Sequence, residues 1–338
     1  AGWTLIPYGG GSSVLGHLTP LTGSRPVVTV SMANMNGLLD FSRTNLMATC
    51  QAGITGPQLE ARLQDRGCTL GHFPQSFEFS TLGGWVATRS SGQQSLGYGN
   101  IRHLFRGGQV ISPSGDLNIP AIPSSAAGPD LREVILGSEG RMGILTQATI
   151  QISPLPEKER FHAFMLPDWD RSLQAVRSLL QNRIPLSMIR LSNAGETRTT
   201  MAMSGHDNML EVLNTYLRLR GLGPEACMLL LGFSGQKRRT RQAVRAALAE
   251  VRRYGRGVHL HTFLGRAWHR KRFLAPYLRN TLWEMGFAVD TLETAVPWDR
   301  VTRTMQDIES SLSMGLADVN ERVHAFAHLS HVYSTGSS

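Results

Sequence analysis

Three glycine-rich stretches hold the residues of this chain that are best suited to bind a charged ligand. The first stretch, residues 7–13, reads Pro-Tyr-Gly-Gly-Gly-Ser-Ser and directly follows a short apolar run. Consecutive glycines let backbone N–H groups turn toward an anion without obstruction from side chains, and a pyrophosphate would fit there. The stretch lacks both the Gly-Lys-Ser/Thr of a Walker loop and the GxGxxG pattern of a dinucleotide fold. Alone, a triple glycine is more often a structural turn.

The second and third glycine-rich stretches strengthen the interpretation of the first. Residues 72–92 are crowded with glycines, hydroxyls and small side chains, and residues 136–145 add further glycines just before a β-branched run. Hydroxyl and amide donors beside apolar neighbours suit a polar ring or a ribityl chain. Three separated loops therefore predict one large, extended cofactor. We expect valine at Gly10 or Gly84 to abolish its retention, because a Cβ would block the approach of the backbone or force an unfavourable φ.

Strands and tight loops must position these stretches, because the first half of the chain alternates glycines with short β-branched runs. Strands are predicted at residues 3–6, 27–30, 46–50 and 144–152. One helix interrupts them. Thr55 and Gln58 fit a capping box at its start, Pro57 suits its first turn, Leu59 and Leu63 share a face, and Gly67 supplies a stop.

The second half of the chain has a different texture, with longer amphipathic helices after the Pro-Leu-Pro run at 154–156. We therefore predict a domain boundary there, with domains at residues 1–154 and 155–338. Two apolar helix faces mark the second domain, one made by Leu173, Val176, Leu179 and Leu180, the other by Val244, Ala247, Leu248 and Val251. The solvent side of the second helix is predicted to carry Arg241, Arg245 and Arg252.

Composition narrows the class of protein. The chain has 338 residues, enough for two or three domains, and its 34 basic and 25 acidic side chains give a net charge of +9. No nucleic-acid motif accompanies this surplus, so nucleic acid is not an expected partner. Three cysteines without CxxC spacing support neither a disulfide framework nor a cysteine zinc site, which favours a reducing, cytoplasmic location. No apolar run reaches the roughly 18 residues of a membrane span. The chain looks cut at both ends, so we expect elements to be missing there.

Several segments together match a known family. In the first half they are Pro-Tyr-Gly-Gly-Gly-Ser-Ser-Val at 7–14, Glu-Phe-Ser-Thr-Leu-Gly-Gly-Trp-Val at 78–86, Tyr-Gly-Asn-Ile at 98–101 and Gly-Ser-Glu-Gly at 137–140. In the second half they are Ser-Met-Ile-Arg-Leu at 187–191 and Ala-Val-Pro-Trp-Asp-Arg-Val at 295–301. With these segments the chain resembles the FAD-binding proteins of the vanillyl alcohol oxidase and p-cresol methylhydroxylase type, and within them the alkyldihydroxyacetonephosphate synthases. The resemblance spans nearly the whole chain.

The resemblance implies an α+β fold, in which an FAD-binding domain of the p-cresol methylhydroxylase type is followed by an α+β substrate (cap) domain. It implies FAD contacts from four segments, whose residues are Pro7, Tyr8, Gly9, Gly10, Gly11, Ser12, Ser13, Gln75, Ser76, Phe77, Glu78, Phe79, Ser80, Thr81, Thr88, Arg89, Ser90, Ser91, Glu139, Gly140, Arg141, Met142, Gly143, Ile144 and Leu145. Gln75 departs from the synthase pattern, which favours Asp there, and brings an uncharged amide instead. We expect noncovalent FAD, because no loop offers the His or Cys that flavinylated relatives use.

The resemblance also implies four catalytic or substrate-binding residues. Arg190 matches an arginine near the synthase active site and would hold a phosphate or carboxylate rather than serve stability, although a solvated arginine at a strand end is the alternative. His72 matches a histidine near the flavin, but a lone histidine beside an aromatic residue is more often structural. His328 stands where the synthases carry a substrate-binding arginine, and His331 follows it. We expect no metal site, because two strand residues three apart face opposite sides, and the His-x-Gly-Asp-Gly-Asn-x-x-His pattern of D-2-hydroxy acid dehydrogenases is missing.

Three functions stay open at this point. The resemblance implies first an FAD-dependent enzyme of ether lipid synthesis, which exchanges the acyl group of acyl-dihydroxyacetone phosphate for a fatty alcohol without net oxidation or reduction. The second is an FAD-linked oxidase or dehydrogenase of a 2-hydroxy acid, with His328 or His331 as the base. The third is a remnant that binds flavin without catalysis. The expected partner is a lipid-like or 2-hydroxy acid small molecule, and a peripheral membrane contact and a homodimer stay open.

Overall fold

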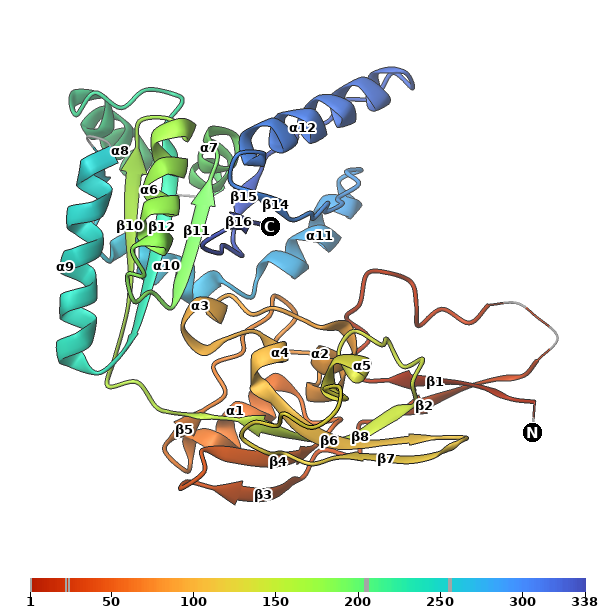
Figure 1. Cartoon of the computed structure of the whole chain (residues 1–338). Helices are drawn as coiled ribbons and strands as arrows, with labels where there is room; N and C mark the ends of the chain where they lie inside the picture. Colours follow the sequence, from red (N-terminus) through yellow and green to blue (C-terminus); the bar gives the residue numbers. More distant parts are fainter. Residues whose placement is uncertain (1, 22, 24, 204–206, 255–256) are drawn as a thin grey trace. The chain divides into compact units, whose positions relative to one another are not determined.

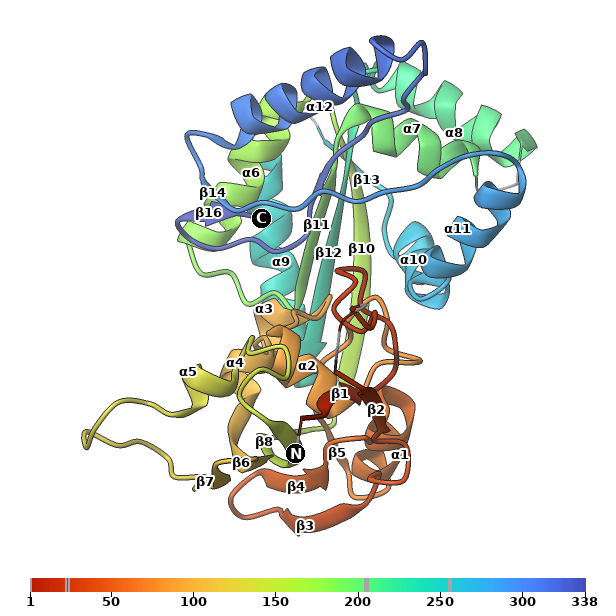
Figure 2. The ribbon, with the colours of Figure 1, turned by 90° about the vertical axis from the view of Figure 1, so that its right-hand side faces the viewer.

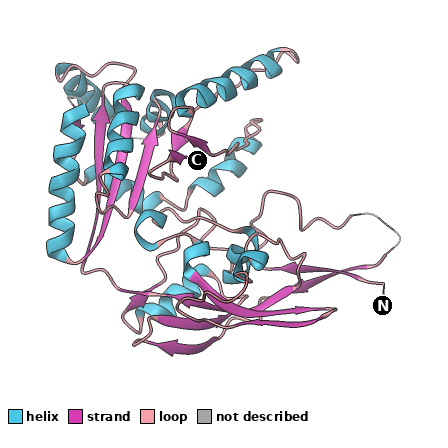
Figure 3. Ribbon diagram, in the orientation of Figure 1, coloured by secondary structure: helices cyan, strands magenta, loops and turns pink. Residues whose placement is uncertain are grey.

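The computed structural model describes residues 2–21, 23, 25–203, 207–254 and 257–338, and the chain divides into two compact units (Figure 1). Unit 1 runs to Leu155 and also includes the later segment Phe273–Leu278. Unit 2 holds Pro156–Arg272 and Arg279–Ser338. Each unit combines helices with a five-stranded sheet of its own (Figure 3).

The sheet of unit 1 is antiparallel, with the strand order β3-β4-β8-β6-β7. Its strands are β3 (Leu38–Ser42), β4 (Met47–Gln51), β6 (Phe105–Ser112), β7 (Gly115–Ile119) and β8 (Ile144–Gln151). Two smaller pairs complete the unit: the parallel pair β1 (Thr4–Tyr8) and β2 (Val27–Ser31), and the antiparallel pair β5 (Cys68–Thr69) and β9 (Ser153–Pro154). The parallel pair holds the start of the first glycine-rich stretch.

Strand predictions in unit 1 hold in position but differ in length. The first strand extends to Tyr8 rather than ending at Ile6, because Pro7 and Tyr8 pair in parallel register with Val30 and Ser31. The strand predicted at 46–50 starts one residue later, since Leu46 has a left-handed φ of 50° and lies in the turn before β4. The predictions from sequence do not include β3, β6 and β7.

The helices of unit 1 are short, apart from the predicted one. They are α1 (Gly56–Gln64), α2 (Leu82–Thr88), α3 (Ser95–Tyr98), α4 (Ile101–Leu104) and α5 (Arg132–Ile135). The predicted start of α1 is confirmed, because Gln58 Oε1 accepts a hydrogen bond from the Thr55 N–H at 3.1 Å. Leu59 and Leu63 are both fully buried and anchor α1 on the core of unit 1.

The sheet of unit 2 is antiparallel as well, with the order β13-β10-β12-β11-β15. Its strands are β10 (Lys158–Leu166), β11 (Met188–Ser192), β12 (Cys227–Gly235), β13 (Val258–His259) and β15 (His328–Leu329). Helices α6 (Trp169–Gln181) and α9 (Lys237–Tyr254) lie together on one side of this sheet, and α10 (Phe263–Lys271) lies against β10 on the other (Figure 2).

The two amphipathic helices predicted for the second domain are α6 and α9. Val176 and Leu179 of α6 and Ala247 and Val251 of α9 are buried, while Leu173, Leu180, Val244 and Leu248 are half-buried at the edges of these faces. Arg241, Arg245 and Arg252 are exposed as predicted. The remaining elements are α7 (Ala194–Ala202), α8 (Asp207–Leu219), α11 (Ala275–Glu284), α12 (Val301–Ala317), and the antiparallel pair β14 (Val296–Pro297) and β16 (Gly336–Ser337). None of the helices in the described part of the chain has the length and apolar character that a membrane span requires.

Candidate functional site

The first glycine-rich stretch packs closely on residues 79–81, which directly precede α2. A Cβ added to Gly10 would lie 1.9 Å from the carbonyl oxygen of Phe79, and one added to Gly9 would lie 2.4 Å from Thr81 Oγ1. Gly11 has a φ of +66°, a conformation that L side chains rarely adopt. Three consecutive glycines are therefore required for this close approach in unit 1.

The N–H groups of this stretch remain available to a ligand. The carbonyl of Tyr8 accepts a hydrogen bond from Met32 N–H at 2.9 Å, which ends the pairing with β2. Among the residues that the structure describes, no acceptor pairs with the backbone N–H groups of residues 9–13. Such a run of free N–H groups beside a glycine turn suits the phosphate oxygens of a cofactor.

The third glycine-rich stretch meets the first one and the end of α2. A Cβ added to Gly140 would lie 3.0 Å from Pro7 Cγ, and Gly140 itself has a φ of +81°. Gly137 N–H donates to the Val86 carbonyl at 3.0 Å, and Glu139 N–H donates to the Ala87 carbonyl at 2.9 Å. The structure thus brings all three predicted stretches together within unit 1.

Residues 75–81 divide into two groups by the direction of their side chains. Phe77, Ser80 and Thr81 are buried, whereas Gln75, Glu78 and Phe79 are exposed and Ser76 is half-buried. Ser80 Oγ accepts from Trp85 Nε1 at 2.7 Å and donates to the Ser76 carbonyl at 2.8 Å, so it fixes the segment from inside. Thr81 is the N-cap of α2. The side chains of the exposed group point away from the core of unit 1.

A segment from far along the chain packs on these same residues. Phe273 stacks on Phe77 with ring centroids 5.1 Å apart and an angle of 19° between the planes. Tyr277 donates a hydrogen bond to Glu78 Oε2 at 2.8 Å, and its ring meets Phe79 edge-on at 6.0 Å. The Phe273–Leu278 segment therefore packs as part of unit 1, whereas the sequence-based boundary assigns it to the second domain.

Residues 88–91 surround the end of α2. Thr88 Oγ1 donates to the Gly84 carbonyl, and Arg89, which caps α2 with a left-handed φ of 54°, forms a partly exposed ion pair with Glu133 at 2.8 Å. Ser90 Oγ lies 2.7 Å from His72 Nε2. Ser91 Oγ is a buried atom that has no hydrogen-bond partner among the described residues, as is Asn100 Oδ1 nearby in sequence. Unpartnered buried oxygens of this kind fit a site completed by a ligand.

His72 is fully buried, and its ring meets Trp85 edge-on at 4.9 Å. It therefore lies in the core behind residues 88–91 and orients Ser90 through their hydrogen bond.

The rest of the third stretch is more open: Arg141 and Met142 are exposed, Glu139 accepts from Arg141 at 3.4 Å, and Ile144 and Leu145 begin β8. Gly143 has a φ of +129° and passes close to the Ile111 carbonyl oxygen.

Gly84 differs from Gly10 in its surroundings. It lies in α2 without a positive φ, and a Cβ there would meet only Thr81 Oγ1, at 3.2 Å. The expectation that Gly84 needs its missing side chain for conformational reasons is therefore not supported by its backbone.

A charged cluster in unit 2 gathers two of the predicted catalytic residues. Arg190 in β11 donates to Glu196 Oε1 at 2.5 Å, and His328 Nδ1 in β15 lies 3.0 Å from the same oxygen. His328 Nδ1 is also 3.1 Å from Arg190 Nη2. The side chain of Glu196 is 6% exposed, while those of Arg190 and His328 are 28% and 34% exposed. One buried carboxylate thus holds two partly exposed cationic or polar groups, which can meet an anion from solvent.

Electrostatics in this cluster favour the ionised carboxylate. Burial by itself raises the pKa of Glu196, but the hydrogen bond from His328 and the charge of Arg190 hold that pKa at about 2. Arg190 therefore also serves stability, which corrects the expectation that it serves only the substrate. The reason is that removing either partner would leave Glu196 buried and uncompensated.

His331 lies near this cluster but outside β15, which ends at Leu329. The alternation argument that places it opposite His328 therefore does not apply. Burial lowers the pKa of His331, the charges of His328 and Arg190 lower it further, and Glu293 opposes them. Its Nδ1 is buried and has no hydrogen-bond partner within the described ranges.

Glu196 was not identified from sequence. Its backbone N–H is capped by Asn193 Oδ1 at 2.9 Å, so the Asn-x-x-Glu spacing at 193–196 is a helix-start signal. That signal locates the first turn of α7. It does not reveal that the carboxylate turns back toward β11.

Two further features of unit 2 bear on chemistry. His162 Nδ1 lies 3.0 Å from His259 Nε2. Burial is the main cause that lowers the pKa of each to about 4, and ionisable neighbours lower it further.

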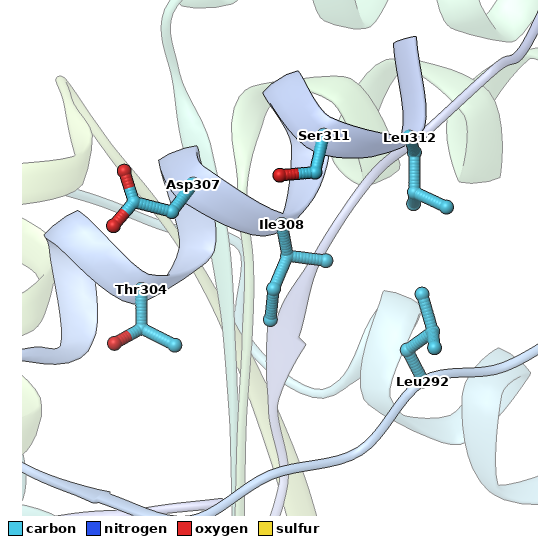
Figure 4. A pocket seen from close by; sticks show the side chains of 6 residues that line it. All are labelled: Leu292, Thr304, Asp307, Ile308, Ser311 and Leu312. Atoms are coloured by element: carbon cyan, nitrogen blue, oxygen red, sulfur yellow. The ribbon is translucent and has the colours of Figure 1, made fainter. Parts of the chain in front are cut away.

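A hollow of about 400 Å³ lies between α12 and the chain before β14, and in Figure 4 Ile308 and Leu312 point from α12 toward Leu292. Its other lining residues are Thr304, Asp307 and Ser311. Within the described residues, no group of three or more His, Cys, Asp or Glu side chains is placed to hold a metal ion.

Comparison with protein families assigns both halves of the chain. Residues 1–118 match the FAD binding domain, and residues 155–337, more than half of the chain, match the C-terminal domain of FAD linked oxidases. The chain belongs to the FAD-linked oxidase family. The expected fold class, an FAD-binding domain followed by a mixed α and β domain, is thereby confirmed, and so is FAD as the cofactor. We call residues 7–13 and the segments packed on them, 79–81 and 137–140, the cradle of unit 1. Its free N–H groups and its close glycine contacts fit that cofactor.

Individual relatives of this chain fall into two groups. Alkyldihydroxyacetonephosphate synthase of Dictyostelium discoideum is 32% identical over 98% of this chain and 55% of its own length. A solved structure of an alkyldihydroxyacetonephosphate synthase superposes with a TM-score of 0.89 at 31% identity, over 99% of this chain and 62% of that one. D-2-hydroxyglutarate dehydrogenase of Stutzerimonas stutzeri is 30% identical over 54% of this chain and 39% of its own length. The chain thus spans a little more than half the length of the synthases it resembles.

Proposed function

We propose that this chain belongs to an FAD-dependent enzyme of the alkyldihydroxyacetonephosphate synthase kind, which exchanges the acyl group of acyl-dihydroxyacetone phosphate for a fatty alcohol. The observation that carries the proposal is the extent of similarity. The synthases match both units, over 98% of the chain, whereas the D-2-hydroxyglutarate dehydrogenase matches 54% of it. The charged cluster of unit 2 agrees with a substrate that has an anionic head.

In this proposal the two units have separate tasks. The free N–H groups of residues 9–13 would hold the pyrophosphate of FAD, while Ser91 Oγ and the exposed side chains of residues 75–79 would meet the rest of the cofactor. The flavin ring, when bound, would supply a reactive centre that the amino acid side chains lack. Arg190, fixed by Glu196, would bind the phosphate of the substrate, because a guanidinium forms paired charge-assisted hydrogen bonds with such a group.

The test compares exchange with oxidation in the FAD-loaded protein. With acyl-dihydroxyacetone phosphate and a fatty alcohol, we expect release of fatty acid and formation of the ether product, with no oxygen uptake and no dye reduction. The exchange balances without electrons, since the ester oxygen leaves with the acyl group and the alcohol oxygen replaces it. Oxygen consumption or dye reduction that accompanies turnover would contradict the proposal.

The second candidate function is oxidation of a 2-hydroxy acid by the flavin. His328 favours it, because a histidine replaces the arginine of the synthase pattern and can accept a proton. Its pairing with Glu196 would orient the ring. With D-lactate, glycolate or 2-hydroxyglutarate we expect the flavin to stay oxidised. Bleaching of the flavin by any of them, followed by reoxidation with a dye, would replace the synthase by the oxidase, and inertness in both assays would leave the flavin-binding remnant.

Noncovalent attachment, a cytoplasmic location, a peripheral membrane contact and a homodimer remain predictions. Acid precipitation tests the first one directly. Flavin that stays with the precipitated polypeptide would contradict noncovalent binding, whereas flavin released into the supernatant supports it.

A further inference from the structure

Glu60 is a buried carboxylate in unit 1 for which the sequence offers no explanation. It lies on the inner side of α1 with 5% of its surface exposed, and no ion pair joins it to a described basic residue. Burial raises its pKa, and only hydrogen bonds oppose this effect. A buried carboxylate without a cationic partner is unfavourable unless its oxygens are well satisfied. Its hydrogen bonds therefore indicate what it does.

Apart from a long hydrogen bond from Gln64 Nε2 in α1, at 3.5 Å, the hydrogen bonds to Glu60 come from the end of β5 and the two residues that follow it. Glu60 Oε1 accepts from the N–H groups of Leu70 and Gly71 at 3.0 and 3.1 Å, and Oε2 accepts from Thr69 Oγ1 at 2.7 Å. Thr69 Oγ1 in turn accepts from Gly71 N–H at 3.0 Å. Gly71 has a φ of +73°, and a Cβ there would lie 2.2 Å from the ring of Tyr98. The carboxylate thus fixes the backbone of a turn in which Leu70 is buried in the core and Gly71 lies against the ring of Tyr98.

This turn is followed directly by residues that contact the segment 90–93, one of the segments that we propose bind FAD. His72 follows Gly71 and contacts Ser90 Oγ through Nε2 at 2.7 Å. Phe73 follows, and its carbonyl accepts from Gln93 N–H at 2.9 Å. Residues 71–73 therefore support residues 90–93, among them Ser91 with its unpartnered hydroxyl.

We propose that Glu60 is a positioning residue for FAD, which acts through the turn at Leu70 and Gly71 to set His72, and through His72 sets Ser90 and Ser91 at the cofactor. The proposal rests on FAD binding by unit 1. Glu60 itself does not touch the cofactor. Its effect is to hold Ser90 and Ser91 in a fixed position, so that FAD binds to groups that are already in place.

The experiment titrates FAD into Glu60→Gln, Glu60→Ala and Thr69→Val and follows flavin absorbance and fluorescence. The matched control is Glu250→Gln in unit 2, since Glu250 is a carboxylate buried to a similar degree that accepts from the Ser178 hydroxyl and from Asn182. We expect Kd for FAD to rise roughly tenfold or more in Glu60→Ala and less in Glu60→Gln, and to stay within about twofold in the control. Circular dichroism at the titration temperature confirms that each variant is folded.

A double-mutant cycle distinguishes positioning from a general loss of stability. If Glu60 acts through Ser90, the effects of Glu60→Gln and Ser90→Ala on Kd are smaller together than their product. Multiplicative effects, an unchanged Kd in folded Glu60→Gln and Thr69→Val, or an equal loss in Glu250→Gln would each overturn the proposal. If the unaltered chain fails to bind FAD, flavin binding itself is refuted, and that outcome is distinct from a defect seen only in the variants.

Discussion

The glycine-rich cradle of unit 1 and the charged cluster of unit 2 offer different kinds of groups to the anions that we propose they bind. In unit 1 the binding groups belong to the backbone, and glycines are needed because other segments approach within van der Waals distance. In unit 2 they belong to side chains, and a buried glutamate holds them in place. A site made of backbone is sensitive to added volume. A site made of side chains is sensitive to lost charge and to pH.

The largest expected effect is that of added volume at Gly10. In Gly10→Val the new side chain would collide with the Phe79 carbonyl, so the free N–H groups of residues 9–13 would be displaced. Losing two hydrogen bonds to phosphate is worth roughly 3 kcal/mol or more, so Kd for FAD should rise at least about 100-fold. Absorbance titration with FAD measures this.

The matched control for that prediction is Gly84→Ala. With only Thr81 Oγ1 near its new methyl group, this variant should bind FAD within about threefold of the unaltered chain, since a change without a clash is usually worth less than roughly 0.5 kcal/mol. Equal losses at both glycines would mean that the contact with Phe79 does not explain the effect of Gly10.

The next effect is that of acid on the cluster of unit 2. The pKa of Glu196 is about 2 in the folded chain and near 4.3 in an unfolded one, so its contribution is complete above about pH 4.3 and is lost as the pH falls toward 2. Its size is roughly 3 kcal/mol by linkage. Glu196→Gln should therefore destabilise unit 2 at pH 7 and remove most of its loss of stability between pH 4.3 and 2. Urea denaturation at several pH values measures both, and an unchanged acid profile would contradict the assigned ion pair.

Arg190→Lys tests the same cluster through function. Lysine keeps the charge but loses the planar fork, and one charge-assisted hydrogen bond in a sheltered site is worth roughly 1.5–3 kcal/mol. We expect the exchange activity to fall by roughly 10- to 150-fold. Because Arg190 also pairs with Glu196, thermal unfolding should shift to a slightly lower temperature. A large loss of stability with unchanged activity would make Arg190 purely structural.

The smallest effect concerns the buried histidine pair of unit 2. The pKa values of His162 and His259 lie near 4, below the usual 6.5, so their stabilising contribution is complete above pH 6.5 and is lost as the pH falls toward 4. Arg160, Arg252 and His261 are the ionisable neighbours that, after burial, lower these pKa values further. His162→Gln should reduce the loss of stability between pH 6.5 and 4 by roughly 1–2 kcal/mol. Melting curves across this range test it, and an unaltered slope would refute it.

Glu60 in unit 1 differs from the buried groups of unit 2, because its pKa is raised whereas the pKa values of Glu196, His162 and His259 are lowered. A raised pKa in the folded chain means that Glu60 favours folding most at low pH and less as the pH rises through that pKa. Acid should thus weaken unit 2 through His162 and His259 while relieving a buried charge in unit 1.

Local signals account for the features that the sequence predicts well. The helix start at Thr55 and Gln58, the buried faces of α1, α6 and α9, and the grouping of glycines all depend on residues close together in the chain. The charged cluster does not, since Arg190 and His328 are 138 residues apart and meet only because β11 and β15 pair. Glu60 was missed for a related reason. A lone glutamate on a helix is usually solvated, and only the tertiary structure shows that it faces inward.

The return of the Phe273–Leu278 segment to unit 1 has a consequence for synthesis of the protein. Phe77 and Glu78 leave the ribosome long before the residues that cover them, Phe273 and Tyr277. At roughly 5–20 residues per second, translation from Leu155 to Phe273 takes on the order of ten seconds. During that interval the residues of unit 1 up to Leu155 have been synthesised, but Phe273 and Tyr277, which pack on Phe77 and Glu78, have not. A nascent chain halted before residue 273 should therefore recruit chaperones at Phe77, and release from them should coincide with emergence of the segment.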